Sequence, residues 1–410
     1  MNELFALVRK AVELRMPWRM NMRLWRWIAR SAVREFPWAW GVVNAVVIAV
    51  LILLGALGST IGIVVVALLA VWELVLARFA VLTLRAAETL RDALSDLEAD
   101  WGKERARFPL SHIAFPLLML RSPPGVRRIR GVEYARDGDR ALRLDVYTPI
   151  EKRDQPRPAV IQVHGGGWIV GSRAEQGIPL LNHLASSGWV GFNIDYRLSP
   201  KATWPEHIVD VKRAIAWVRE HAEEYGADPD FICITGGSAG GHLTALAALT
   251  ADEPAFQPGF EDADTSVAAA VPFYGVYDLT NADGVYYPEL LQNVFEPYVF
   301  KARYADDPQL YRDASPTYRV RADAPPFLVL HGDSDTLVPV GDARTFVKRL
   351  REASDSSVFY GELVGAEHAF DVLPSVRTAR VVETIELFLE TIRERRHTPV
   401  ATATSAESIS

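Results

Sequence analysis

The chain has 410 residues, a formal net charge of −7 and a single cysteine, Cys233. Its length exceeds that of one ordinary α/β domain, and its acidic balance argues against nucleic acid as a general partner. One cysteine excludes an intramolecular disulfide, and none of the nine histidines belongs to a cluster with metal-ligand spacing, so we expect no metal site.

The first 35 residues are basic and rich in tryptophan. Eight Lys and Arg side chains are opposed by three acidic ones, and three tryptophans are interleaved with them. The basic residues are Arg9, Lys10, Arg15, Arg19, Arg23, Arg26, Arg30 and Arg34. Such a segment, residues 1–35, is typical of an amphipathic helix on an anionic lipid surface. Nucleic-acid binding is the other interpretation, which the apolar segment that follows directly disfavours.

Residues 36–72 contain no charged side chain. This stretch is too long for one span, since about 20 apolar residues cross a bilayer, and too long for the apolar part of a signal peptide. The sequence GALGST at residues 55–60 interrupts it near the middle. We therefore predict a transmembrane region over residues 36–77, made of two helices at about 38–54 and 61–77. One long tilted helix and a buried helix pair in a soluble protein are the alternatives.

The charge of the first segment predicts the topology. The positive-inside rule places the N-terminus in the cytoplasm. A helical hairpin returns the chain to the same side. It therefore predicts a multi-pass protein of the plasma membrane with its larger domain in the cytoplasm. A single span would place that domain outside. Residues 78–125 have mixed charge and are interpreted as a helical linker. The small, polar tail at residues 397–410 is expected to be disordered.

The most informative motif is GGSAGG at residues 236–241, which follows an apolar run at 231–234 and precedes a helical pattern. A serine between glycines at a strand-to-helix junction is the G-x-S-x-G pattern of a nucleophile elbow. The turn is sharp, and only glycine neighbours leave room for it. Ser238 is therefore the candidate nucleophile. A glycine turn in an ordinary α/β unit is the alternative interpretation of this motif alone.

A second glycine motif, HGGGW at residues 164–168, follows the apolar run at 159–163. A hydrolase with a nucleophile elbow needs backbone N–H donors for the tetrahedral oxyanion. They come from a glycine-rich loop of this type and from the residue after the nucleophile. We therefore expect an oxyanion hole formed by the amides of Gly166, Gly167 and Ala239.

The acid and the base of a triad should follow the serine in chain order. The loop GDSDTLVP at residues 332–339 comes after an apolar run and contains two aspartates. Asp335 is favoured as the acid because it lies further along the loop, and Asp333, the alternative, suits a role in supporting the turn. His368, in the motif GAEHAF, is expected to take the proton of Ser238 and give it to the leaving group.

Apolar β-rich runs alternate with helical patterns between residues 126 and 396. The expected strands are 159–163, 189–196, 231–234, 267–274, 327–331 and 358–364. The expected helices are 208–221, 242–249, 340–352 and 376–394. This alternation predicts an α/β fold with a mostly parallel sheet covered by helices on both faces.

Residues 281–324 are too long for a plain connection and are rich in aromatic side chains. We expect this insertion to form a cap over the active site that supplies part of the acyl or alcohol pocket. The alternative is a packed insertion whose aromatic side chains belong to the core.

The motifs resemble those of the hormone-sensitive-lipase-like, or acetyl-esterase, branch of the α/β-hydrolase family. The matching segments are LDVYTP, HGGGW, DYRLSP, GGSAGG, HGDSDTLVP and GAEHAF, and the resemblance as a whole covers about residues 131–394. The resemblance implies the α/β-hydrolase fold for residues 126–396. One departure is Gly237, where many members carry an acidic residue. It is expected to alter local hydrogen bonds without changing the mechanism.

Together the motifs predict a membrane-anchored serine carboxylesterase or lipase that acts through a Ser238–His368–Asp335 triad, an acyl-enzyme and no cofactor. The expected partners are an acyl ester or lipid substrate and membrane lipid bound through the N-terminal segment, without nucleic acid. An amidase, formamidase or acyltransferase with the same triad is the alternative, because the acyl-enzyme is shared. A second alternative is a non-catalytic membrane scaffold that keeps the fold for binding.

Overall fold

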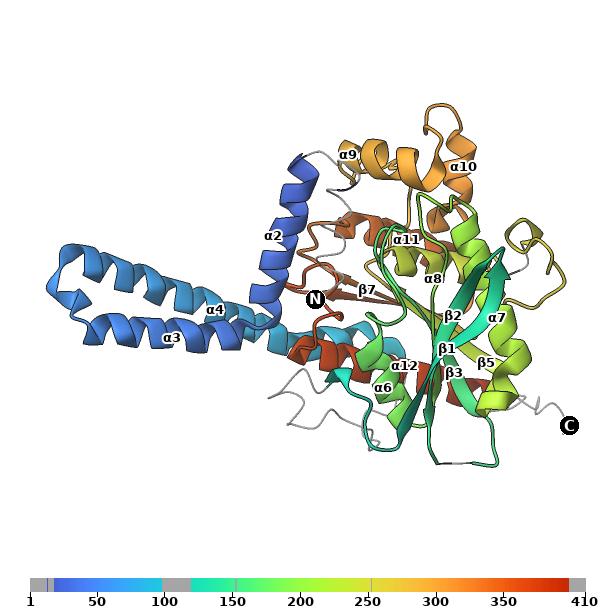
Figure 1. The fold of residues 1–410 in the computed structure, drawn as a ribbon, viewed down its shortest axis with the longest axis horizontal. Helices are drawn as coiled ribbons and strands as arrows, with labels where there is room; N and C mark the ends of the chain where they lie inside the picture. Colours follow the sequence, from blue (N-terminus) through green and yellow to red (C-terminus); the bar gives the residue numbers. More distant parts are fainter. Residues whose placement is uncertain (1–12, 14–17, 98–118, 152, 252, 398–410) are drawn as a thin grey trace, which may run out of the picture.

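The computed structural model describes residues 13, 18–97, 119–151, 153–251 and 253–397. In this part of the chain an eight-stranded sheet lies at the centre, helices cover both of its faces, and a pair of long helices projects from one side (Figure 1). The expected disordered tail, most of the expected linker beyond residue 97 and the start of the basic segment lie outside the described residues.

The sheet has the strand order β1-β2-β4-β3-β5-β6-β7-β8. Its strands are β1 (Val126–Asp137), β2 (Arg140–Pro149), β3 (Arg157–Val163), β4 (Val190–Ile194), β5 (Ala227–Gly237), β6 (Ala269–Phe273), β7 (Phe327–Gly332) and β8 (Val358–Leu363). β2 is antiparallel to both of its neighbours, and the strands from β4 to β8 along the sheet are parallel. The loops after β3, β5, β7 and β8, which carry the four main motifs, therefore lie at one edge of the sheet.

The expected α/β fold with a mostly parallel sheet is confirmed, and each of the six expected strands is present. The additional strands are β1 and β2, which form an antiparallel pair at the sheet edge. β1 has the sequence VRRIRGVEYARD and leaves most of its side chains at least partly exposed. An edge strand with this many charges carries no apolar alternation, which is why the sequence pattern does not reveal it.

Two hydrophobic cores lie on the two faces of the sheet. Along β3, Ile161 belongs to the first core and Val160 to the second, as the strand pleat requires. The first core includes side chains from α7 (Glu206–His221), α8 (Ala239–Leu249) and α11 (Val340–Ala353). The second includes side chains from α6 (Ile178–Ser186) and α12 (Val376–His397).

The N-terminal helices are α2 (Trp18–Glu35), α3 (Pro37–Leu53) and α4 (Thr60–Ala93). α3 and α4 pack side by side as an antiparallel hairpin that projects from the rest of the molecule (Figure 1). The chain turns at Gly55, with a φ of 82°, and at the short helix η1 (Ala56–Gly58). The region therefore forms two helices joined by a tight turn, not one long helix.

The second helix is longer than the helix expected at about residues 61–77. α4 continues to Ala93 and so includes the first part of the segment interpreted as a helical linker. Its C-terminal part packs against α12 and β8, with Ala86 and Leu90 buried in the second core. Burial of this apolar face stabilises the helix beyond the region that the run of uncharged residues marks.

By length and composition, α4 is a candidate membrane span within the described residues. Residues 20–35 of α2 and the whole of α3 pass the same test only as a pair, bent by 85° at their junction. The hairpin exposes a large apolar surface. Among its most exposed side chains are Val42, Leu53, Leu54, Ile61, Leu68 and Leu74.

The expected insertion, residues 281–324, forms short helical segments next to the N-terminal end of α2 (Figure 1). They are α9 (Pro288–Leu290), the π-helical η6 (Leu291–Phe300), α10 (Pro308–Asp313) and η7 (Pro316–Tyr318). Most of its aromatic side chains are packed, as in the alternative interpretation. Tyr286, Phe295, Phe300 and Tyr311 are buried in the first core.

Candidate active site

Ser238 lies on the turn between β5 and α8. Its backbone has a φ of 58° and a ψ of −120°, a strained conformation for a residue with a side chain. Its N–H donates to Phe273 O at 3.0 Å, which ties the turn to β6. A Cβ atom on Gly240 would lie 2.2 Å from Val163 O, so glycine is required for α8 to approach β3 this closely. The motif therefore folds as a sharp strand-to-helix elbow.

The departure at Gly237 has a steric reason. A Cβ atom there would lie 2.6 Å from Tyr274 Oη, so an acidic side chain does not fit. The Tyr274 hydroxyl instead donates to Asp371, and its ring centroid lies 4.6 Å from that of His368. Burial raises the pKa of Asp371, which the bond from Tyr274 partly offsets. A tyrosine–aspartate pair thus occupies the space beside the nucleophile.

The oxyanion loop follows β3 and brings its glycines to the cavity that contains Ser238. Gly166 and Gly167 have φ values of 112° and 61°, and both line this cavity. The N–H of Gly165 is already bonded to Gln176 Oε1 at 2.7 Å. Ala239 is the first residue of α8, where a helix leaves its amide without an intrahelical partner. Ala239 is fully buried and is not among the residues that line the cavity.

His164 packs against this loop and supports it. Its ring stacks on Tyr196 at 4.4 Å between centroids, and its Nδ1 lies 2.8 Å from Gly165 O. Burial lowers the pKa of His164, which keeps the imidazole neutral. It therefore serves the loop as a packed, uncharged side chain.

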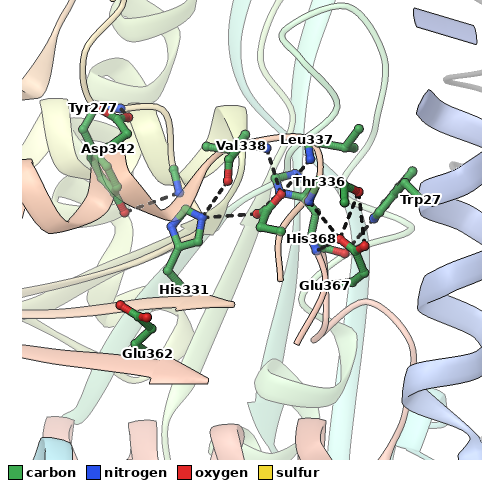
Figure 2. A network of polar contacts seen from close by, with 12 residues as sticks. Trp27, Tyr277, His331, Thr336, Leu337, Val338, Asp342, Glu362, Glu367 and His368 are labelled. Atoms are coloured by element: carbon green, nitrogen blue, oxygen red, sulfur yellow. Dashed lines mark hydrogen bonds and ion pairs between the residues drawn. The ribbon is translucent and has the colours of Figure 1, made fainter. Parts of the chain in front are cut away.

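The structure brings Asp335 and His368 together. His368 Nδ1 lies 2.6 Å from Asp335 Oδ2. Figure 2 shows His368 within the polar network of the acid and histidine loops. The other oxygen of this carboxylate, Oδ1, accepts from the N–H groups of Leu337 and Val338 at 2.9 and 2.8 Å. The acid loop thus holds the carboxylate with its own backbone and points one oxygen at the histidine.

A second histidine contacts the same carboxylate. His331 Nε2 lies 3.2 Å from Asp335 Oδ2. It also lies 2.9 Å from Val338 O (Figure 2). Burial alone would raise the pKa of Asp335, but the imidazoles of His368 and His331 outweigh it and hold the pKa below its ordinary value. The carboxylate is therefore ionised throughout the neutral range, as an acid that orients a base must be.

Asp333, the alternative acid, lies elsewhere in the loop. Its Oδ1 accepts from Gly365 N at 2.7 Å and from the Ser334 hydroxyl at 2.8 Å. It thereby joins the loop after β7 to the loop after β8. These contacts indicate a structural role for Asp333. Asp335 is the aspartate that lies beside His368.

Ser238 and His368 line one cavity of about 180 Å³. Its walls come from the oxyanion loop, the acid and histidine loops, the insertion and α2. The lining is mostly apolar and includes Trp168, Val276, Val294, Phe295, Leu337 and Val372. Of the aromatic side chains in the insertion, Tyr287 and Phe295 reach this cavity.

The part that α2 plays in this site does not follow from any motif. Met20, Arg23, Leu24 and Trp27 line the cavity, although the sequence places them in a segment expected on lipid. The signal available in the sequence was the spacing of apolar residues in an amphipathic helix, since residues three or four apart share a face. That periodicity says that one face is apolar, but not whether lipid or protein covers it.

His242, in the first turn of α8, links the elbow to the insertion. Its Nε2 donates to Ala314 O at 2.7 Å, and its ring packs edge-on against Trp168. Burial lowers the pKa of His242 to about 4. The folded protein therefore requires this side chain to be neutral.

Replacement of His242 by glutamine is expected to reduce the acid sensitivity of folding. The pKa of His242 is lower in the folded state than in the unfolded state. Its contribution to the free energy of unfolding is therefore fully present above about pH 6.5 and is lost as the pH falls through about 4. Over this window the wild type should lose about 3 kcal/mol more than the variant, which keeps a donor for Ala314. Urea-unfolding midpoints at pH 7, 5.5 and 4 measure the difference, and parallel curves would contradict it.

Among the described residues, no group of three or more His, Cys, Asp or Glu side chains is arranged to hold a metal ion.

The BD-FAE family model matches residues 144–350, a segment that includes the oxyanion loop, Ser238 and Asp335. Among curated proteins, the chain is similar to the probable carboxylic ester hydrolase LipM and to esterase LipC, both of Mycobacterium tuberculosis (strain ATCC 25618 / H37Rv). It is 49% identical to LipM over 284 residues and 44% identical to LipC over 285. Each match covers 67% of this chain, together with 66% of LipM and 70% of LipC.

Among solved structures, the chain is similar to the butyrate-bound form of esterase 2 from the planctomycete Thermogutta terrifontis. The TM-score is 0.54 at 29% identity, over 67% of this chain and 97% of that chain. The α/β-hydrolase fold expected from the motifs is thereby confirmed. The family match, the relatives and the shared fold show that this chain belongs to the BD-FAE family of α/β-hydrolase esterases.

Proposed function

We propose that this protein is a membrane-anchored serine carboxylesterase. One observation carries the proposal. Ser238, on its strained elbow, shares a cavity with His368, whose Nδ1 lies 2.6 Å from Asp335. The relatives LipM and LipC, which are named a carboxylic ester hydrolase and an esterase, support the same chemistry.

The proposed reaction has two halves that share an acyl-enzyme. Ser238 Oγ attacks the ester carbonyl while His368 takes its proton, and the amides of Gly166, Gly167 and Ala239 hold the negative oxygen. The alcohol leaves with the proton from His368, and the acyl group stays on Ser238. Water then attacks the acyl carbonyl with His368 as the base, the bond from the acyl group to Ser238 Oγ breaks, His368 returns the proton to Oγ, and the carboxylic acid leaves. Asp335 accepts the Nδ1–H of His368 and stabilises the imidazolium in both halves.

The cavity supports an acyl group of modest size. Its volume of about 180 Å³ is comparable to that of a protein cavity of roughly 150 Å³ that holds benzene, so it suits an acyl chain of roughly six carbons. Butyrate is bound to the Thermogutta esterase 2 that shares this fold. We therefore place short and medium acyl esters ahead of long-chain lipids as substrates.

The helical hairpin supports the membrane anchor. α3 has 17 residues, about 26 Å of helix, which is close to the roughly 30 Å of a bilayer core. The apolar side chains on its surface and on the first half of α4 are largely exposed, and a surface of this extent in water would drive association. In lipid, such apolar side chains are exposed without the free-energy cost of contact with water.

Two polar side chains within the hairpin, Asn44 and Glu73, are paired with each other. Asn44 Nδ2 donates to Glu73 Oε2 at 2.7 Å and to Leu69 O at 3.0 Å. A Cβ atom on Gly41 would lie 2.9 Å from Glu73 Oε1, so the small residue leaves room for this carboxyl group. Internal pairing of this kind is what polar side chains at membrane depth require.

Product analysis with competing acceptors tests the proposed activity. We expect purified protein to hydrolyse p-nitrophenyl butyrate and hexanoate faster than palmitate, and to react with a fluorophosphonate probe, since the Thermogutta esterase is phosphonylated by sarin. Added alcohol should divert little of the acyl group, and the matching p-nitroanilide should react far more slowly. Dominant transfer to the alcohol would favour an acyltransferase, dominant anilide cleavage an amidase, and absence of both labelling and turnover a scaffold.

Protease accessibility tests the proposed topology. Both α2 and the C-terminal part of α4 contact the hydrolase domain, so both ends of the hairpin lie on the side of that domain. With the basic segment in the cytoplasm, the domain should be digested in inside-out vesicles and protected in intact cells. Digestion in intact cells would contradict the cytoplasmic placement.

A further inference from the structure

Helix α2 contacts the histidine loop at three successive turns. The contacts join Trp27 Nε1 to His368 O at 2.8 Å, Arg30 Nε to Glu367 Oε1 at 2.7 Å, and Arg34 Nη1 to Gly365 O at 3.2 Å. Figure 2 shows α2 alongside this loop, with Trp27 reaching towards it. Three evenly spaced contacts define a docked helix rather than a single accidental touch.

The contact at Glu367 extends to the acid loop. This side chain is fully buried, and its Oε2 accepts from Thr336 N at 2.9 Å (Figure 2). Thr336 directly follows Asp335. Glu367 therefore joins α2, the histidine loop and the acid loop in one polar network.

The contact at Trp27 holds a strained piece of backbone. The residue after His368, Ala369, has a φ of 61°, which a residue with a side chain adopts only when its surroundings impose it. Trp27 is buried, donates to the carbonyl of His368 and places its ring edge-on to the imidazole, 6.0 Å between centroids. Both the carbonyl and the ring of His368 are therefore contacted by a side chain outside the hydrolase domain.

α2 also closes one side of the substrate cavity. Met20 and Leu24 line it, and Leu24 is buried together with Trp27 against the acid and histidine loops. At the end of this wall, the Arg23 guanidinium lies 3.3 Å from the centroid of the Tyr287 ring in the insertion. The wall of the cavity is thus continuous from the insertion to the histidine loop through α2.

We propose that α2 is a working part of the active site, in which Trp27 is a positioning residue for His368 and Leu24 helps to set the acyl-chain length. This inference rests on the proposed esterase function and deepens it. α2 ends at Glu35, which is buried in an ion pair with Arg377, and α3 begins two residues later. The helix that completes the site is therefore the one that leads into the hairpin.

Paired tryptophan variants of the full-length, detergent-solubilised protein test the positioning role. Trp27→Phe removes the N–H donor and keeps an aromatic ring, and it should lower kcat for p-nitrophenyl butyrate roughly 10-fold with little change in KM. The rate of fluorophosphonate labelling should fall in proportion. Trp25→Phe is the matched control, because Trp25 lies on the exposed face of the same helix, and it should leave both rates unchanged. Equal kcat in the two variants would overturn the role of Trp27.

A second pair tests the wall without relying on the first. Leu24→Ala enlarges the cavity and should raise the ratio of kcat/KM for octanoate over butyrate roughly 10-fold. Met22→Ala, on the exposed face, should leave this ratio unchanged. An unchanged ratio in Leu24→Ala would overturn the assignment of this wall.

The outcomes separate this inference from the proposed function. A wild type without turnover and labelling would contradict the esterase. The role of Leu24 in the cavity wall would then be tested by the affinity for octanoate of the Leu24→Ala and Met22→Ala variants, measured by calorimetry. The positioning role would be decided by the rate at which diethyl pyrocarbonate modifies His368 in the Trp27 and Trp25 variants, read by mass spectrometry. Equal values within each pair would overturn the corresponding part.

Discussion

Ser238→Ala is expected to lower kcat for ester hydrolysis by roughly 10⁶-fold, because removal of a triad nucleophile leaves only binding and the oxyanion donors. The strained φ of 58° already accommodates a Cβ atom, so alanine should be tolerated at the elbow. The rate of p-nitrophenyl butyrate hydrolysis and the labelling by a fluorophosphonate probe should both fall to background.

The control for this variant is Ser95→Ala, which removes an exposed serine outside the cavity. It should match the wild type in rate and in labelling. The unfolding midpoint of Ser238→Ala should stay close to that of the wild type, which separates lost chemistry from lost structure. Hydrolysis that persists in folded Ser238→Ala would remove this serine from the mechanism.

Asp335→Asn is expected to lower kcat by about 10⁴-fold, the second largest effect. The amide can still accept from Leu337 and Val338 through its oxygen, so the loop should keep its shape. Its NH₂ group would then face His368 Nδ1, which favours the tautomer with the proton on Nε2 and removes the base. The loss should appear in kcat rather than in KM.

Asp333→Asn is the matched comparison, because it makes the same change two residues away. Its oxygen can still accept from Gly365 and Ser334, whose bonds it makes in the wild type. We expect activity within about 10-fold of the wild type and a loss of stability of at most about 1 kcal/mol, because Asp333 is exposed and its two hydrogen bonds are at most partly buried. Steady-state kinetics and urea unfolding of both variants decide the assignment, and a larger kinetic loss in Asp333→Asn would reverse it.

Local backbone chemistry explains why the motifs were predictive. Ser238 is flanked by glycines because α8 must approach β3 closely, and Gly166 and Gly167 take positive φ values at the cavity. Requirements of this kind are met within a few residues and therefore appear in the sequence. The parallel order of the strands then brings the four loops to one edge, which follows from the alternation of strands and helices.

The edge strand and the long N-terminal helix show where such reasoning ends. β1 carries charges along most of its length because its side chains face water, so no apolar pattern marks it. α4 extends beyond the uncharged run because its later turns pack against α12 and β8. In both elements, the neighbours rather than the local sequence decide the structure.

The sequence by itself determined the nucleophile motif, the glycine loop, the two candidate aspartates and the uncharged stretch at residues 36–72, since each depends on residues close together in the chain. Only the tertiary structure decided that Asp335 rather than Asp333 lies beside His368, that Tyr274 leaves Gly237 no room for an acidic side chain, and that Trp27 contacts the histidine loop. These are contacts between segments far apart in sequence. Their geometry depends on how helices and loops pack, and the same amphipathic pattern in α2 is compatible with lipid or with protein as its partner.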